Sequence, residues 1–497
     1  MKTSTKVILG VYGAFVGAWL AGSAYFLANG RDEELEEGLI PVEEPLPREE
    51  NAYYLFPKLH EFHQTNYNFS IANDFLNGRT NSPAILAEVS ELVDAHSNLF
   101  ACARQIVACR GYQVPEGESK MAAIGPLVSH PTARLYQMKA RCEALRGDRK
   151  AAQATIDELI EFGRFVRRTG SVVGYLIGVG YIGMAMGQGV RSPIAAPEDC
   201  AWRKHLVEVL QEQEESSVGL ICAVEGELAF AQQHFEDIQT NAVITTNYLL
   251  RDGLDGFGWL TRNSWRDGVL SCCANEQIRI DWKRVDRSCV GVILSCCLGY
   301  SRHAFKPNAM LNELGRHSRD FADKMKSASF DREYANKREF DEDRILPFRE
   351  NWLGVQLVRH WNIHGTYESH YRSLFAWRSG RLRLACENYR FAKGRYPTEL
   401  AELVPDCIAA VPLDPYDGQP IRYNAEHGYF WTPGPDGTFD GKVDFDEDGY
   451  PRWKNRNYHF VELLDMTKRN RPPSTYCNMS RRKNPKRAKG IIRVRAY

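Results

Sequence analysis

The sequence predicts a mainly α-helical protein with an N-terminal transmembrane helix and a small C-terminal α+β domain. Apolar residues recur at helical three-four spacing over most of residues 51–365. Residues 7–30 contain no charged side chain, and two short strand-like runs follow a turn at residues 417–418. A chain of 497 residues is also too long for a single small core.

The uncharged stretch at residues 7–30 is long enough to cross a membrane. A helix rises about 1.5 Å per residue, and the hydrocarbon core is about 30 Å thick. Lys2 and Lys6 precede the stretch, whereas five acidic residues follow within residues 32–37. The positive-inside rule therefore predicts a cytoplasmic N-terminus and an extracytoplasmic body. The alternative is a signal peptide cleaved after Ala24, with an unusually long apolar core; it sends the body to the same compartment.

Composition divides the chain into five predicted segments. Residues 1–30 form the membrane anchor, and residues 31–50 form an acidic, proline-interrupted linker. Residues 51–365 form the helical body, and residues 366–465 form the α+β domain. Residues 466–497 form a basic, disordered tail. The thirteen cysteines include no CxxC pair, so most are expected to be buried free thiols.

A helical hairpin is expected at residues 135–165, with its turn at Arg146-Gly147-Asp148. This hairpin resembles one tetratricopeptide-type unit, but no further copies recur at a fixed period. The expected body is therefore an irregular, TPR-like stack of helices.

A second uncharged stretch lies at residues 169–190. Its Gly174/Gly178 and Gly183/Gly187 pairs have the small-xxx-small spacing of closely packed helices. Two interpretations stay open: a second membrane span, or a buried helix whose glycines admit close neighbours. Seven glycines lower the hydrophobicity of the stretch and favour the buried helix.

No motif in the body identifies a catalytic site. The chain lacks HExxH, GxSxG and the kinase HRD/DFG pair. His360 and His364 are spaced to share a helix face, with Glu368 and His370 nearby, but such spacing arises by chance among 13 histidines. The sequence therefore predicts a non-enzymatic protein. The alternative is an envelope hydrolase with a metal or cysteine site among the helices.

The C-terminal domain begins with a long helix over residues 371–389. Gly394 suits the left-handed position that ends this helix, and Pro397 suits the first turn of a short second helix. Three apolar residues are expected to pack the short helix onto the long one: Leu400, Leu403 and Val404.

The segments PIRYN and GYFWT then predict a hairpin of two short strands, joined through residues 425–428. The pieces ENYRFAKGRYPTELAELV, VPLDPYDGQPIRYN and TPGPDG, in this order, resemble the globular domain of type II secretion major pseudopilins. The whole chain resembles uncharacterised, helix-rich bacterial envelope proteins that carry this module. A pseudopilin has its peptidase signature and apolar helix directly before the domain, and this chain does not, so processing as a pilin is not expected.

The resemblance implies a calcium site, because the acidic loop of the resembled domain binds calcium. Asp436 of GPDG matches the family motif, and four further aspartates follow it: Asp440, Asp444, Asp446 and Asp448. Alternate aspartates on a glycine-containing turn supply the oxygen ligands that calcium prefers. The alternative is a solvated acidic turn.

The basic tail carries no acidic residue after Asp465. It predicts contacts with anionic lipids, acidic envelope polymers or an acidic protein, and no nucleic-acid partner is expected outside the cytoplasm. Over the whole chain, basic and acidic residues balance at 63 each. The predicted protein is a single-pass, extracytoplasmic scaffold or binding protein of the bacterial cell membrane. It is expected to associate with a secretion or pilus-like assembly, a link that rests on fold analogy.

Overall fold

The computed structural model describes most of the body and of the C-terminal domain. The described residues are 32–40, 44–61, 74–116, 118, 130–214, 217–240, 306–336, 351, 363–438 and 461–463, without positions 79, 192, 197 and 328. The predicted membrane anchor and the predicted basic tail lie outside these residues.

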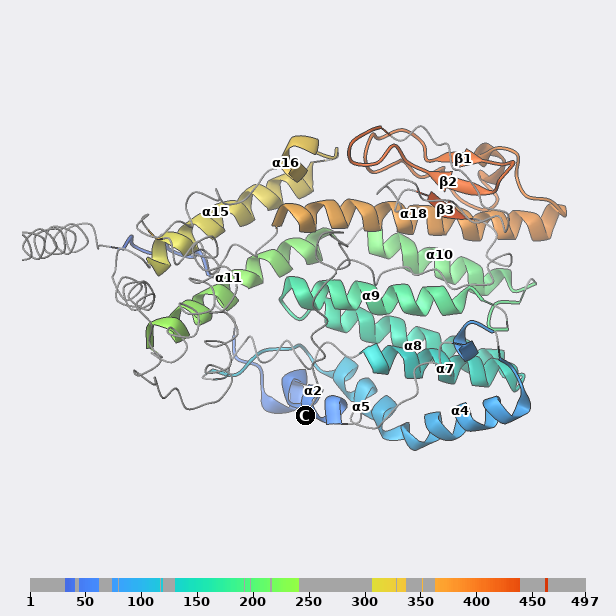
Figure 1. Cartoon of the computed structure of the whole chain (residues 1–497), viewed down its shortest axis with the longest axis horizontal. Helices are drawn as coiled ribbons and strands as arrows, with labels where there is room; N and C mark the ends of the chain where they lie inside the picture. Colours follow the sequence, from blue (N-terminus) through green and yellow to red (C-terminus); the bar gives the residue numbers. More distant parts are fainter. Residues whose placement is uncertain are drawn as a thin grey trace, which may run out of the picture.

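The described chain is mainly helical, as predicted (Figure 1). The body contains the 3-10 turns η1 (Arg48–Glu50) and η2 (Ala52–Tyr54) and the helices α2 (Phe56–Glu61), α4 (Pro83–Ala95), α5 (Ser97–Ala108), α7 (His130–Leu145), α8 (Arg149–Arg167), α9 (Val172–Gly189), α10 (Cys200–Glu214), α11 (Ser217–Thr240), α15 (Pro307–Lys326) and α16 (Arg332–Asn336). The C-terminal elements are α18 (Ile363–Lys393), η6 (Leu400–Leu403), β1 (Arg422–Asn424), β2 (Tyr429–Trp431) and β3 (Val461–Leu463).

The predicted helical hairpin is confirmed by α7 and α8, which pack on each other. Gly147 lies in the turn with φ of 93°, a conformation that glycine adopts without steric cost. The Asp148 carboxylate caps α8 by accepting a hydrogen bond from the Ala151 amide at 3.0 Å. Thr155 of α8 donates to the Glu143 carboxylate of α7 at 2.7 Å, so the two helices are also joined by a polar contact.

α9 packs along α8 through the first of its two glycine pairs. A Cβ atom on Gly178 would lie 2.5 Å from the backbone nitrogen of Arg167 and 2.5 Å from the carbonyl oxygen of Gly163. Positions Gly183 and Gly187 instead face open space. α9 is long and apolar enough to cross a membrane, yet half of it is buried within the protein. This packing favours the interpretation of residues 169–190 as a buried helix.

α11 lies against the turn between α8 and α9. A Cβ atom on Gly226 would overlap the carbonyl oxygen of Gly170. The neighbouring Glu227 carboxylate accepts a hydrogen bond from the Val172 amide at 2.7 Å, at the start of α9, and burial raises the pKa of Glu227. These contacts fix α11 to the beginning of α9.

α18 connects the body to the C-terminal elements and runs across the predicted boundary at residue 365. It packs on α10 along one side, and the small sheet lies on another (Figure 1). The Glu214 carboxylate of α10 pairs with Arg378 at 3.2 Å and with Arg381 at 2.7 Å. One cluster of buried apolar side chains extends from Ala52 to Phe430. The C-terminal module, defined as residues 394–438 and 461–463, is therefore built onto the same core as the body.

The C-terminal elements follow the predicted order with three differences. Gly394 has φ of 75° after the end of α18, as predicted. The short second helix, however, is the 3-10 turn η6, which begins three residues after Pro397. Leu400 and Leu403 are buried as expected, but Val404 is exposed, so its predicted packing is wrong. The third difference concerns the sheet.

The predicted hairpin is confirmed, with β1 and β2 antiparallel and Tyr423 opposite Phe430. The sequence pattern does not predict β3, which pairs antiparallel with the other edge of β2. The three short strands thus form one sheet in the order β1-β2-β3, and β3 also contacts α18.

The described parts of the predicted linker are fixed to the body. Residues 32–40 lie along α15. The Leu46 amide donates to the Gln113 side chain at 2.7 Å, and the Arg110 amide donates to the Glu50 carbonyl at 3.0 Å. The seven cysteines in the described residues are free thiols, and Cys102, Cys142 and Cys386 among them are buried.

Candidate functional site in the C-terminal module

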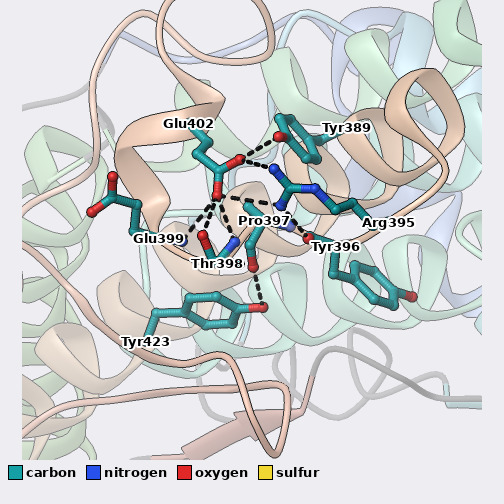
Figure 2. A network of polar contacts seen from close by, with 8 residues as sticks. All are labelled: Tyr389, Arg395, Tyr396, Pro397, Thr398, Glu399, Glu402 and Tyr423. Atoms are coloured by element: carbon teal, nitrogen blue, oxygen red, sulfur yellow. Dashed lines mark hydrogen bonds and ion pairs between the residues drawn. The ribbon is translucent and has the colours of Figure 1, made fainter.

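The loop between α18 and η6 is organised around the Glu402 carboxylate (Figure 2). One carboxylate oxygen, Oε1, accepts hydrogen bonds from the Thr398 amide at 2.7 Å and from the Thr398 hydroxyl at 2.6 Å. The other oxygen accepts from Arg395 at 2.7 Å and from the Tyr389 hydroxyl. Glu402 therefore joins the end of α18, the loop and η6.

The local sequence explains this arrangement. Gly394 ends α18 in a left-handed conformation, which reverses the chain direction. Glu402 then occupies the third position of η6 and accepts from the Glu399 amide at 3.3 Å, as in a capping box. The Tyr423 hydroxyl of β1 donates to the Pro397 carbonyl at 3.3 Å, so the loop is also tied to the sheet (Figure 2).

Glu402 is suited to a structural role. The hydrogen bonds from Arg395, Thr398 and Tyr389 hold the pKa of this carboxyl well below its usual range. A general base needs a pKa near the working pH and a free oxygen to accept the proton. Both oxygens of Glu402 are already hydrogen-bonded, so this residue fixes the loop.

Replacing Glu402 by Gln is expected to loosen residues 395–400. The glutamine amide has a single oxygen, so it cannot accept all the hydrogen bonds that the two carboxylate oxygens accept. It also lacks the negative charge that binds Arg395. Since the folded-state pKa is depressed, the stabilisation by Glu402 is present above its ordinary pKa of 4.5 and is lost as the pH falls toward the folded-state value. Hydrogen exchange of the loop amides should therefore be faster in Glu402→Gln at neutral pH, and the difference from wild type should shrink in acid.

The matched control for this change is Glu426→Gln at the exposed hairpin turn. This control should leave the exchange of residues 395–400 unchanged. Equal exchange in Glu402→Gln and in wild type at neutral pH would show that the carboxylate does not hold the loop.

A second carboxylate, Asp414, is buried and closes the proline loop before β1. Its oxygens accept from the Tyr416 amide at 2.9 Å and from Arg422 at 3.1 Å. Its own amide donates to the Gln419 carbonyl at 2.6 Å. Arg422 also pairs with Asp417 at 2.5 Å. Burial raises the pKa of Asp414. The hydrogen bonds of Asp414 hold this loop in its conformation.

The predicted calcium site begins at Asp436, in the turn that follows β2. Asp436 is exposed, and its side chain accepts from the Thr438 amide at 3.1 Å. Arg332 of α16 donates to the Pro435 carbonyl at 2.7 Å and lies against Gly437, so α16 fixes the base of the turn. The other four predicted ligands lie outside the described residues: Asp440, Asp444, Asp446 and Asp448. The calcium site thus stays a prediction.

Millimolar calcium is expected to raise the melting temperature relative to excess chelator. Crowded carboxylates repel one another, and a cation bound only to the folded state stabilises it by about 2.7 kcal/mol at a hundred times its dissociation constant. Differential scanning calorimetry of the wild type and of Asp444→Asn/Asp446→Asn would measure the effect. An equal melting temperature with calcium and with chelator would leave the solvated acidic turn as the explanation.

The histidines of α18 are buried within the helix packing. His360 lies outside the described residues, whereas His364 and His370 are buried. Glu368 pairs with Arg372 at 2.5 Å. The His370 ring packs against Tyr371 and Trp377. Within the described part of the chain, no three histidine, cysteine or acidic side chains are grouped to hold a metal ion.

The Glu402 network is the main feature that the sequence motifs do not identify. Part of a signal is nonetheless present, because in a capping box a Ser or Thr cap is followed three positions later by Glu or Gln, and here Glu stands at both positions. Glu399 and Glu402 have this spacing.

Comparisons of the chain with protein-family models, with curated proteins and with solved structures found no match. The resemblance to pseudopilin domains therefore rests on the sequence pieces themselves. Function must be argued from the individual residues and their surroundings.

Proposed function

We propose that this protein is a membrane-anchored scaffold or binding protein of the bacterial cell envelope, associated with a secretion or pilus-like assembly. Residues 7–30 anchor it, the N-terminus is cytoplasmic, and the body and C-terminal module are periplasmic. The acidic loop that begins at Asp436 holds a structural calcium ion. The basic tail at residues 466–497 contacts anionic polymers, lipids or an acidic protein partner.

The observation that supports a scaffold is the use of polar groups in the C-terminal module. Glu402 and Asp414 are the carboxylates with the densest hydrogen bonding there, and both brace loops. Arg422 is engaged by Asp414 and Asp417. Charged side chains that hold loops in place favour a role as a rigid binding surface over a role in catalysis.

The continuity of the core supports the same proposal. α18 carries buried residues from Ile363 to Tyr389, all but its last four residues. Its pairs with Glu214 lie at the contact with α10. A module that shares its supporting helix with the body is held at a defined position, as a scaffold requires.

Proximity labelling from the C-terminus in intact cells is the direct test. Envelope proteins should be enriched, and a variant truncated after Asp465 should lose those partners that bind the tail. The control is the same labelling enzyme on the anchor alone, residues 1–40. Equal partner sets for the full chain and for the anchor would contradict the proposal.

Topology and chemistry need separate measurements. A C-terminal tag should be digested by protease in spheroplasts, and an N-terminal tag should be protected. The reverse pattern would overturn the assigned orientation. Stoichiometric zinc in the purified protein, together with turnover in a hydrolase substrate screen, would replace the scaffold by the hydrolase alternative.

A further inference from the structure

Residues 32–40, named the strap here, lie along α15 and begin at its N-terminus. The two carboxylate oxygens of Asp32 accept hydrogen bonds from the Asn308 amide at 2.9 Å and from the Ala309 amide at 3.0 Å. Amides in the first turn of a helix have no acceptor within the helix, and an acidic group there also interacts favourably with the helix dipole. The strap thus supplies the N-terminal cap of α15.

The middle of the strap is bound one turn and three turns further along α15. The Asn312 side chain accepts from the Glu36 amide at 2.9 Å and donates to the Glu34 carbonyl at 2.9 Å. The Glu36 carboxylate pairs with Arg319 at 2.9 Å. α15 therefore contacts both the acidic side chains and the backbone of the strap.

The end of the strap is held by apolar packing. Leu39 is buried in a cluster between α11 and α15 that is separate from the main core. Its partners in this cluster include Phe235 of α11 and Leu314 of α15. A Cβ atom on Gly315 would overlap the Leu39 side chain, so the glycine provides the space for it. The strap is consequently fixed at both of its ends.

This docking places α15 very close to the end of the apolar stretch. Only Arg31 separates Gly30 from Asp32, and two residues span at most about 7 Å. The headgroup region on each side of the hydrocarbon core is roughly 5–8 Å thick. With residues 7–30 in the membrane, the N-terminus of α15 lies at the level of the lipid headgroups.

We propose that the strap seats the α11–α15 end of the body on the membrane surface and holds the C-terminal module away from it. This inference rests on the proposed membrane anchor. The strap and α15 lie at one end of the long axis of the molecule, and β1, β2 and the end of α18 lie at the other (Figure 1). α18 alone, with 31 residues, is about 46 Å long. The module is thus held at the end of the molecule that is far from the membrane surface.

The test uses the full chain in vesicles of phosphatidylethanolamine and phosphatidylglycerol with an acceptor dye on the headgroups. A donor dye is attached through a genetically encoded azide at exposed Arg316 on α15, or at exposed Phe391 near the end of α18. Energy transfer should be several-fold more efficient from position 316 than from position 391. Equal transfer from the two positions would overturn the proposal.

Two independent variants test the strap itself. The double variant Asp32→Ala/Leu39→Ala removes the contacts that hold the two ends of the strap. The variant Gly315→Ala displaces the Leu39 side chain. Both should reduce the difference in energy transfer, and the first should also speed hydrogen exchange at the Asn308 and Ala309 amides. The matched control is Glu37→Gln at an exposed strap position, which should behave as wild type. An unchanged transfer difference in both strap variants would contradict the seating role.

Failure of the anchor is distinguishable from failure of the strap. Release of the wild type by alkaline carbonate, or a mature N-terminus after Ala24, would refute the membrane anchor and with it the seating of the body. Strap docking would still be measured by amide exchange in the released protein. A retained anchor with equal transfer from both positions would refute the seating and leave the anchor intact.

Discussion

Replacing Gly178 by Ala is expected to lower the free energy of unfolding by about 3 kcal/mol, at the upper end of typical overpacking costs. The new Cβ atom would lie 2.5 Å from backbone atoms of both Arg167 and Gly163. Both residues lie in the last turn of α8, and backbone atoms there cannot move aside as the end of a flexible side chain can. Alanine is the better helix former by about 1 kcal/mol, which offsets only part of this cost. Urea unfolding followed by circular dichroism would measure the change.

Gly183 provides the matched control on the same helix. Its added Cβ atom would meet open space, so Gly183→Ala is expected to stabilise the protein by about 0.5–1 kcal/mol through helix propensity. The two substitutions should therefore have opposite signs. Equal stability of the two variants would show that α8 and α9 do not meet at Gly178.

Acidification from about pH 6.5 to about pH 4 is expected to cost about 3 kcal/mol of stability through His370 alone. Burial, and to a smaller extent the charge of Arg378, lowers the pKa of His370 to about 4. The native side chain is therefore neutral in this range, whereas the unfolded side chain binds a proton. Acid consequently favours the unfolded state, and this loss of stability sets in as the pH falls below 6.5.

His370→Phe should remove this part of the acid sensitivity. The His370 ring packs against Tyr371 and Trp377, and a phenylalanine ring in its place has no nitrogen that can bind a proton. Urea unfolding of the wild type and of the variant at pH values between the two pKa values would measure it. His427→Gln, at an exposed turn, is the control and should keep the wild-type slope. The same pH dependence in His370→Phe as in wild type would contradict the assignment.

Local sequence features were sufficient where the determining contacts are local. The turn at Gly147 and Asp148 follows from a left-handed glycine and a capping carboxylate three residues from its donor. The end of α18 at Gly394 follows from the same rule. The β1–β2 hairpin follows from two short strand-like runs around a tight turn. Each of these depends on groups only a few residues apart.

The sequence pattern was insufficient to predict an element whose pairing partner is distant in the chain, or a short helix that is 3-10 rather than α. β3 consists of three residues whose only strand signal is their pairing with β2, so no periodicity reveals it. η6 is a short 3-10 turn that begins after its N-cap Glu399 and ends at Leu403, so Val404 lies beyond it and is exposed. The candidate calcium ligands come from the resemblance to pseudopilin domains and stay a prediction, and of the five only Asp436 lies in the described residues.

The sequence by itself determined the mainly helical class, the α7–α8 turn and the order of the C-terminal elements, because each is specified by neighbouring residues. Only the tertiary structure decided which glycine pair of α9 packs against a neighbouring helix. The two pairs have equal spacing, and spacing defines a helix face without showing which element packs on that face. The tertiary structure also decided that the acidic residues after the apolar stretch form a strap. The two amides that Asp32 caps lie 276 and 277 residues further along the chain, and only the folded arrangement of α11 and α15 brings them together.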